Sequence, residues 1–367
     1  MRMRKETFLA ASEGGALTFH CVTRVVDRAF KLGALEKNVF VKIMREYEAF
    51  CGVEVLTYCV MSNHIHLLVR ADRSQVEDIA DEELLKRIAV LYSGDRVALV
   101  EKTLKKYRKN HAVKAARELR EQYLYRMGDI SEFMKGVKQK FSRWYNKANA
   151  RVGTLWESRY SVTMVGEGWA TKVVAAYIDL NPLRAGMVSD PADYKWSGYA
   201  QAVAKAGTAR DRLFAVMQST DYGASQGASA AANVKEAIAQ YRVLLAEEGG
   251  AQDVESAPLP GQKRSTTQKR KKGFSKQAAK AIIDRGGKLS MSQLLRCKAR
   301  YFSDGFAVGS KDFVEGVLSK IQEKTEHLAG RKSAPSKLKH GDVLAGVADG
   351  GGLYSFRKLQ KDPVTLE

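Results

Sequence analysis

The chain has 367 residues, of which 45% are hydrophobic and 28% charged, and its formal net charge is +20 at pH 7. The length suffices for two domains, and the apolar content is ordinary for a globular protein. The positive charge favours a polyanionic partner, nucleic acid first and an acidic membrane surface second, over a basic protein that has no such partner.

The four cysteines are scattered and form no Cys-x-x-Cys pair, which argues against a zinc ribbon or a thioredoxin-like site. Cys21, Cys51 and Cys59 lie in apolar surroundings and are predicted to be small core residues. Such cysteine usage is typical of a reducing compartment. Since the sequence shows neither a signal peptide nor a membrane-spanning stretch, we expect a cytoplasmic protein without a membrane partner.

The hydrophobic pattern of the N-terminal part predicts strands and helices in alternation. A strand is expected over residues 16–24 and a helix over 36–50. Two buried strands follow over 53–58 and 64–70, joined by a tight Met-Ser-Asn turn. Residues 74–128 are charged and helical in pattern, and we expect an inserted helical arm there.

The next segment returns to the predicted sheet. We expect a helix over 130–148, a short strand over 161–165 and a helix over 168–180. The last helix should stop at Asn181-Pro182, because proline disfavours helix in the residue before it. The order strand-helix-strand-strand-helix-strand-helix predicts an α+β fold with helices packed on one sheet.

The remaining chain divides by composition. Residues 201–248 are predicted to be a helical extension, with a helix within 233–248. Residues 249–273 are a linker with basic runs, which can hold DNA phosphates or serve only as a tether. Residues 274–367 are predicted to form a small, basic, mostly helical domain with a possible role in DNA binding. Its helices are expected over 275–286, 290–300 and 311–324.

Two histidines separated by one residue, His64 and His66, fall on the second strand of the predicted hairpin. Side chains alternate along a strand, so both histidines share one face and Ile65 points to the other. Two imidazoles on a rigid strand can hold a divalent metal, although two half-exposed histidines without a role have the same spacing. Imidazoles alone favour zinc or manganese over magnesium.

Residues 63–69, Asn-His-Ile-His-Leu-Leu-Val, resemble the HUH motif (histidine, hydrophobic residue, histidine) of single-tyrosine transposases, which cut and rejoin single-stranded DNA. Three later blocks resemble REP-associated tyrosine transposases, in the family's order: residues 153–160, 176–188 and 194–199. The resemblance implies a ferredoxin-like HUH catalytic domain over residues 1–200 that contains the helical insert.

The resemblance also implies roles for individual residues. Tyr177 would be the nucleophile, and His64, His66 and Asn181 would hold Mg²⁺ or Mn²⁺. Attack by Tyr177 on hairpin-bearing single-stranded DNA would give a 5′-phosphotyrosine, and a free 3′-hydroxyl could reverse the step. No nucleotide cofactor is expected. The resemblance implies a monomer, with a dimer left open.

Several assignments have alternatives. Tyr145 and Tyr160 compete as nucleophiles or could stack on bases, Asp179 is a weaker ligand than Asn181, and His20 could border the site or be a core residue. The basic residues near the motifs are candidate DNA contacts: Lys140, Arg143, Arg159 and Arg184.

Two other functions remain open from the sequence. One is a DNA- or RNA-binding regulator that keeps the fold without cutting, and the other is a metal-dependent phosphodiesterase that uses water as its nucleophile.

Overall fold

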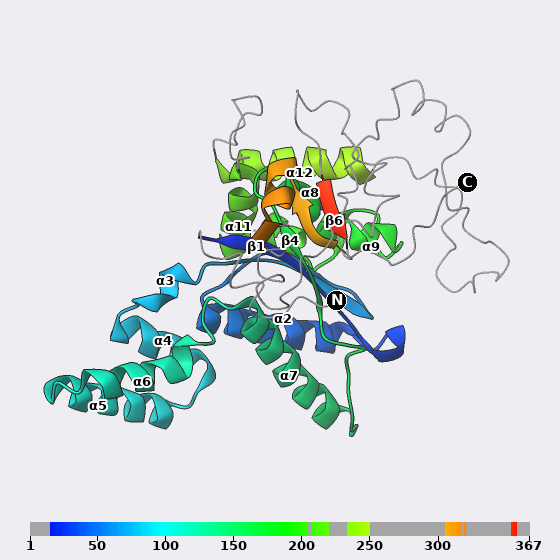
Figure 1. Ribbon diagram of the computed structural model, residues 1–367. Coiled ribbons are helices and arrows are strands. Elements are labelled where there is room, and N and C mark those ends of the chain that lie inside the picture. Colours follow the sequence, from blue (N-terminus) through cyan, green and yellow to red (C-terminus); the bar gives the residue numbers. More distant parts are fainter. Residues whose placement is uncertain are drawn as a thin grey trace, which may run out of the picture.

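The computed structural model describes residues 15–204, 207–219, 233–249, 305–317, 319–320 and 354–357. Its centre is a six-stranded sheet with the strand order β2-β3-β1-β4-β5-β6 (Figure 1). The strands are β1 Leu17–Arg24, β2 Glu54–Val60, β3 His64–Ala71, β4 Ser161–Val165, β5 Gly305–Gly309 and β6 Tyr354–Arg357. Within β2-β3-β1-β4 all neighbours are antiparallel, which is the ferredoxin-like arrangement predicted from the sequence.

Alternation along β3 divides its side chains between two hydrophobic cores. Ile65 and Leu67 are completely buried in the core beneath the sheet, whereas Leu68 is buried in the core on the opposite face. His64 and His66 therefore lie on the same face as Leu68. Because β3 pairs with β2 on one side and β1 on the other, this face is held rigidly.

Helices α2 (Ala34–Cys51) and α7 (Ile130–Ala148) cover the face that carries Ile65 and Leu67 (Figure 1). The rings of Phe40 on α2 and Phe141 on α7 meet at 5.3 Å between centroids. Buried aromatic pairs of this kind fix the two helices against each other. The predicted helices over 36–50 and 130–148 are thus confirmed, and the first extends further at both ends.

The opposite face is covered by α8 (Trp169–Asp179), with α11 (Gly207–Gln218) and α12 (Val234–Gly249) beyond it (Figure 1). Helix α8 is rich in alanine and valine, so it buries nearly all its side chains and packs closely on the strands. The sheet therefore has a helix layer on each side, and α8 brings its residues toward His64 and His66.

Short elements complete the fold. The chain stays helical after α8: α9 spans Asn181–Arg184 and places Pro182 in its first turn, where proline needs no hydrogen-bond donor. The predicted stop at Asn181-Pro182 is therefore a junction between two helices. The remaining short elements are η1 Val26–Arg28, η2 Pro191–Asp193 and α10 Gly198–Val203.

The charged segment after β3 forms a helical arm that projects from the sheet (Figure 1). Its elements are α3 Ser74–Glu77, α4 Asp81–Leu91, α5 Gly94–Lys109 and α6 Val113–Leu124. Asp81 at the start of α4 pairs with Arg108 on α5 and Arg120 on α6, so the arm is tied together by charge as well as by packing. Arg108 and Arg120 are therefore engaged in ion pairs within the arm.

The described part of the C-terminal segment differs from the prediction of a separate helical domain. β5 runs parallel to β4, and β6 pairs with β5, so both strands extend the central sheet. The added strands cover the free edge of β4, and Ala307 and Val308 become fully buried. Residues 311–317 are helical, in agreement with the third predicted helix. Gly249, the first residue of the predicted linker, ends α12, and the remainder of that linker (250–273) and the helices predicted over 275–286 and 290–300 lie outside the described residues.

The next two findings apply only to the residues that the structure describes. No helix among them is long and apolar enough to cross a membrane. Cys21, Cys51 and Cys59 are buried free thiols, as the sequence predicts; Cys297 lies outside the described ranges.

A buried carboxylate fixes α8 in its position. Asp179, 1% exposed, accepts hydrogen bonds from the Thr57 hydroxyl on β2 at 3.0 Å and the Tyr241 hydroxyl on α12 at 2.7 Å. The backbone N–H of Tyr199 donates to it at 3.3 Å. Burial raises the pKa of Asp179 to about 7, although all three donors act in the opposite direction.

Replacing Asp179 by alanine is expected to lower the free energy of unfolding by about 2–4 kcal/mol, because three buried donors lose their acceptor. Tyr241→Phe removes one donor and should cost only about 1 kcal/mol. Urea denaturation followed by circular dichroism measures both losses. Equal stability of Asp179→Ala and the wild type would show that the network does not hold α8.

Candidate active site

His64 and His66 form a compact pair on β3. Their ring centroids are 4.9 Å apart, and His66 is 2% exposed. The Nδ1 atom of His64 lies 2.7 Å from the Asn63 Oδ1 atom. The turn residue before the strand thus orients the first imidazole, and the alternation of β3 brings the second to the same face.

His20 on β1 joins this pair, which the sequence left open. Its Nε2 atom lies 2.9 Å from Nδ1 of His66, and the two rings stack at 5.2 Å between centroids. His20 pairs across the strands with Leu68, which shares the face of His66, so it reaches His66 diagonally. Side-chain alternation along β1 indicates on which face of the sheet His20 lies. Its contact with His66 depends on the register in which β1 pairs with β3.

Tyr177 lies over the histidines from α8. Its ring centroid is 5.8 Å from that of His66 and 5.9 Å from that of His20, both with edge-to-face geometry. The side chain is 6% exposed. The Arg184 guanidinium lies 4.9 Å from the centre of the Tyr177 ring, and its Nη1 donates to the Tyr177 carbonyl at 3.1 Å. Sequence positions more than a hundred residues apart thus converge on one site.

The electrostatics of the site keep the imidazoles neutral. Burial, assisted by Arg24, lowers the pKa of His64 to about 4. Burial also lowers the pKa of His66 well below its usual value, and His64, His20, Arg24 and Arg184 all add to the effect. At neutral pH both rings therefore carry a lone pair, which is the form that binds a metal.

The donor set fits a divalent metal. Each imidazole has its Nδ1 engaged, His64 with Asn63 and His66 with His20, so Nε2 is the nitrogen that each ring offers to an ion. Within the described ranges, no group of three or more His, Cys, Asp or Glu side chains is arranged to hold a metal. A third protein ligand in these ranges would therefore come from another residue type, such as an amide.

Asn181 lies one helical turn after Tyr177, as predicted. Its Nδ2 atom donates to the carbonyls of Tyr177 at 2.9 Å and Ile178 at 3.2 Å. Both contacts use the amide nitrogen and fix the Asn181 side chain against the end of α8. Asp179 points into the buried network with Thr57, which agrees with its lower rank as a candidate ligand.

The structure separates the competing tyrosines from the histidines. Tyr145 is buried on α7 with Phe141, in the core beneath the opposite face of the sheet. Tyr160 packs against the same core, and its hydroxyl donates to Ser131 at 3.2 Å. Neither ring shares the face of His64 and His66.

The four candidate DNA contacts fall in different places. Arg184 lies at the site. Lys140 and Arg143 are on α7, on the opposite side of the sheet, where Lys140 bonds to Glu46 at 2.7 Å and Arg143 is exposed. Arg159 is exposed in the loop before β4. The fold thus brings one of the four beside the histidines.

The hydrogen bond between His66 and His20 is expected to influence how tightly the site binds a metal. To coordinate through Nε2, His66 must carry its proton on Nδ1 and donate it to Nε2 of His20. His20→Leu should therefore weaken Mn²⁺ binding by roughly 10–100-fold. His20→Gln, whose amide oxygen can accept the same proton, should restore part of it. Titration calorimetry with Mn²⁺ measures the change, and wild-type affinity in His20→Leu would refute the role.

Comparisons with known proteins show which family this chain resembles. Residues 15–117 and 123–181 match the family model described as "Transposase IS200 like". No curated protein matches the chain. A solved structure described as a REP-associated tyrosine transposase bound to a REP hairpin is similar to this chain at 14% identity and a TM-score of 0.32. The similarity covers 58% of this chain and 93% of that one. The family match spans β1 through α8 and includes both histidines and Tyr177, so this part of the chain is similar to the IS200-like transposases.

Proposed function

We propose that the protein cleaves and rejoins single-stranded DNA through a covalent bond between Tyr177 and the 5′-phosphate. The observation that carries the proposal is the position of Tyr177, whose ring lies 5.8 Å from His66 on the face of the sheet that also carries His64. A nucleophile and a pair of neutral imidazoles at one buried point suit phosphoryl transfer to a side chain.

The chemistry balances without an external energy source. The Tyr177 oxygen attacks the scissile phosphorus, and the bond from phosphorus to the 3′-oxygen breaks. The phenol loses one proton and the 3′-oxygen gains one, so that it leaves as a hydroxyl. The covalent link conserves the energy of the phosphodiester, so a 3′-hydroxyl can reverse the step. Free tyrosine has a pKa near 10 and is a poor nucleophile at neutral pH, and the Arg184 guanidinium beside the Tyr177 ring would attract the phosphate.

His64, His66 and Asn181 are the residues that would hold a divalent ion, Mg²⁺ or Mn²⁺. Such an ion would supply Lewis-acid stabilisation of the charge that develops on the phosphate. Two nitrogens and one amide oxygen leave positions for DNA oxygens and water, which suits these two ions. His20 then acts as a positioning residue, because it fixes the tautomer of His66.

The substrate proposed is a single strand that carries a hairpin, as the resemblance implies. The net charge of +20 supports a DNA partner. We also propose that three segments add affinity for DNA: the helical arm at residues 74–128, the basic linker at 249–273 and the segment at 274–367. Lys140, Arg143 and Arg159 are proposed to contact phosphates away from the site. The protein is proposed to act as a cytoplasmic monomer.

A covalent-adduct assay tests the proposal. Purified full-length protein is mixed with Mn²⁺ and an end-labelled single strand that carries a hairpin from the flanks of its own gene, and the products are separated on a denaturing gel. A labelled band at the mass of protein plus DNA supports the proposal, and loss of the band with a chelator supports the metal.

The same gel distinguishes the two rival functions. Cleaved DNA without an adduct would indicate a phosphodiesterase that uses water. Binding of the strand with neither adduct nor cleavage would indicate a regulator that keeps only the fold.

A further inference from the structure

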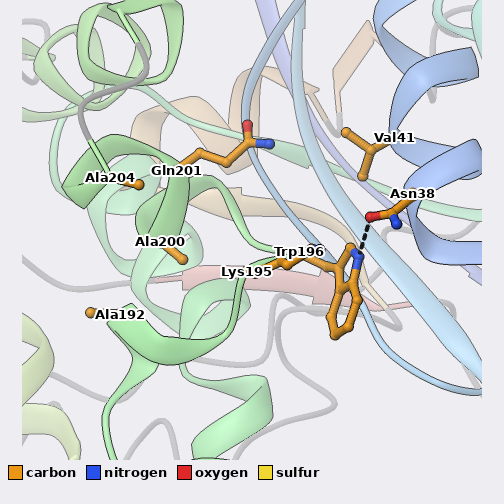
Figure 2. Close-up of a pocket in the computed structure, with 8 residues that line it drawn as sticks. All are labelled: Asn38, Val41, Ala192, Lys195, Trp196, Ala200, Gln201 and Ala204. Atoms are coloured by element: carbon orange, nitrogen blue, oxygen red, sulfur yellow. Dashed lines mark hydrogen bonds between the residues drawn. The ribbon is translucent and has the colours of Figure 1, made fainter. Parts of the chain in front are cut away.

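A pocket of about 360 Å³ opens beside the edge strand β2, between α2 and α10. Its lining residues are Asn38, Val41, Ala192, Lys195, Trp196, Ala200, Gln201 and Ala204 (Figure 2). We call it the Trp196 pocket. The backbone N–H of Val60 donates to the Trp196 carbonyl at 3.0 Å, which ties the pocket to the end of β2 that leads into the turn before His64.

The indole of Trp196 is held in one position while remaining partly exposed. Its Nε1 donates to Oδ1 of Asn38 at 2.9 Å (Figure 2). The Lys37 ammonium lies 4.6 Å from the ring centroid and is itself fixed by a 2.9 Å hydrogen bond to the Tyr194 hydroxyl. A pre-oriented aromatic ring at an opening is a stacking surface that a flat ligand can use with little loss of entropy.

The polar groups around the indole offer donors. Since Asn38 accepts the indole proton with Oδ1, its Nδ2 faces away from that bond. Gln201 accepts from Arg45 with Oε1 at 3.5 Å, which leaves its Nε2 for another partner. Both amides are drawn higher than the indole in Figure 2, and Lys195 adds an exposed ammonium that lies 5.3 Å from the centroid of the Trp196 ring. A ligand that fits this pocket must present several acceptors.

The other walls are small and apolar. Ala192, Ala200, Ala204 and Val41 line the remainder of the pocket and leave room for a flat ring. An aromatic surface, apolar walls and a few donors are the features of sites that bind a single nucleobase. Guanine presents O6 and N7 as neighbouring acceptors, whereas adenine presents a donor beside N7. The donors of this pocket therefore match guanine better.

We propose that the Trp196 pocket binds one unstacked nucleobase of the single-stranded DNA substrate, with guanine preferred. The inference rests on the proposed function, because it assumes that the ligand is DNA. A base held here would fix the register of the strand at the end of the β2–β3 hairpin, and so would select the phosphate that reaches Tyr177.

Binding can be measured apart from cleavage in the full chain that carries Tyr177→Phe. Fluorescence anisotropy is recorded with three labelled strands: an octathymidylate, the same strand with one guanine at its fourth position, and an octamer of abasic sites. We expect the guanine strand to bind tightest. Trp196→Ala should weaken both base-containing strands about tenfold and leave the abasic strand unchanged.

Two further variants keep the test sharp. Gln201→Met retains the shape of the pocket but removes a donor, so it should abolish the preference for guanine while octathymidylate still binds. Trp144→Ala is the matched control, since Trp144 packs against Phe141 on the opposite side of the sheet and should leave all three affinities unchanged.

The inference is overturned if Trp196→Ala behaves like Trp144→Ala, if it weakens the abasic strand equally, or if the wild-type pocket does not distinguish the three strands. Should the adduct assay succeed in any of these cases, the proposed function stands and only the nucleobase pocket is lost. Absence of both an adduct and DNA binding would remove both.

Discussion

Tyr177→Phe is expected to eliminate the covalent adduct and to lower strand cleavage by at least about 10³-fold, because the nucleophilic oxygen is gone and no other group replaces it. The phenyl ring keeps the edge-to-face contacts with His66 and His20. The Arg184 hydrogen bond also remains, since it goes to the backbone carbonyl of residue 177. The variant should therefore fold and bind Mn²⁺ as the wild type does.

Two variants serve as controls for the nucleophile. Tyr145→Phe and Tyr160→Phe change tyrosines that pack beneath the opposite face of the sheet, so both should form the adduct at nearly the wild-type rate. The measurement is the amount of labelled adduct on a denaturing gel as a function of time. An adduct that persists in Tyr177→Phe and disappears in one of the controls would assign the nucleophile to that tyrosine. Cleavage that persists without any adduct would assign it to water.

His66→Ala is expected to abolish detectable Mn²⁺ binding and to lower cleavage by about 10²–10³-fold, because one of two imidazole ligands is lost. The substitution also removes the partner of His20 and opens a cavity in a site that is only 2% exposed. Stability should therefore fall as well, and the thermal midpoint is recorded in parallel so that loss of metal is not confused with loss of fold.

His111→Asn is the control for the metal site. His111 is exposed on the helical arm with a φ of 53°, a backbone conformation that asparagine tolerates well. Titration calorimetry with Mn²⁺ and the adduct assay should both give wild-type results for it. If His66→Ala folds and still binds Mn²⁺ with the wild-type affinity, the metal does not lie at the histidine pair.

Local patterns in the sequence predicted most of the catalytic fold. The alternation around His64 and His66, and the apolar run before it, fixed the hairpin and the common face of the two imidazoles, because strand periodicity is a local property. The apolar spacing of the helix over 130–148 gave both its ends correctly for the same reason. The chain order of these elements then predicted an α+β fold with helices packed on one sheet, and the resemblance to single-tyrosine transposases implied its ferredoxin-like form.

The prediction was weaker where a contact joins distant segments. Helix α8 ends at Asp179, close to the predicted stop at Asn181-Pro182, but the short helix α9 begins directly after it, since a proline in a first turn costs no hydrogen bond. The strand over 305–309 was not expected, because it is stabilised by pairing with β4 and β6, which lie far from it in the sequence.

By itself the sequence determined which residues can do chemistry and how they are spaced within their own segment: His64 with His66 on one face of a strand, and Tyr177 one helical turn before Asn181. The tertiary structure alone decided which of these faces meet. It placed α8 over the histidines and α7 with Tyr145 on the other side of the sheet, and it brought His20 to His66. The physical reason is that side-chain periodicity follows from backbone geometry within a segment, whereas the burial of two apolar faces against each other depends on every other segment that competes for the same sheet.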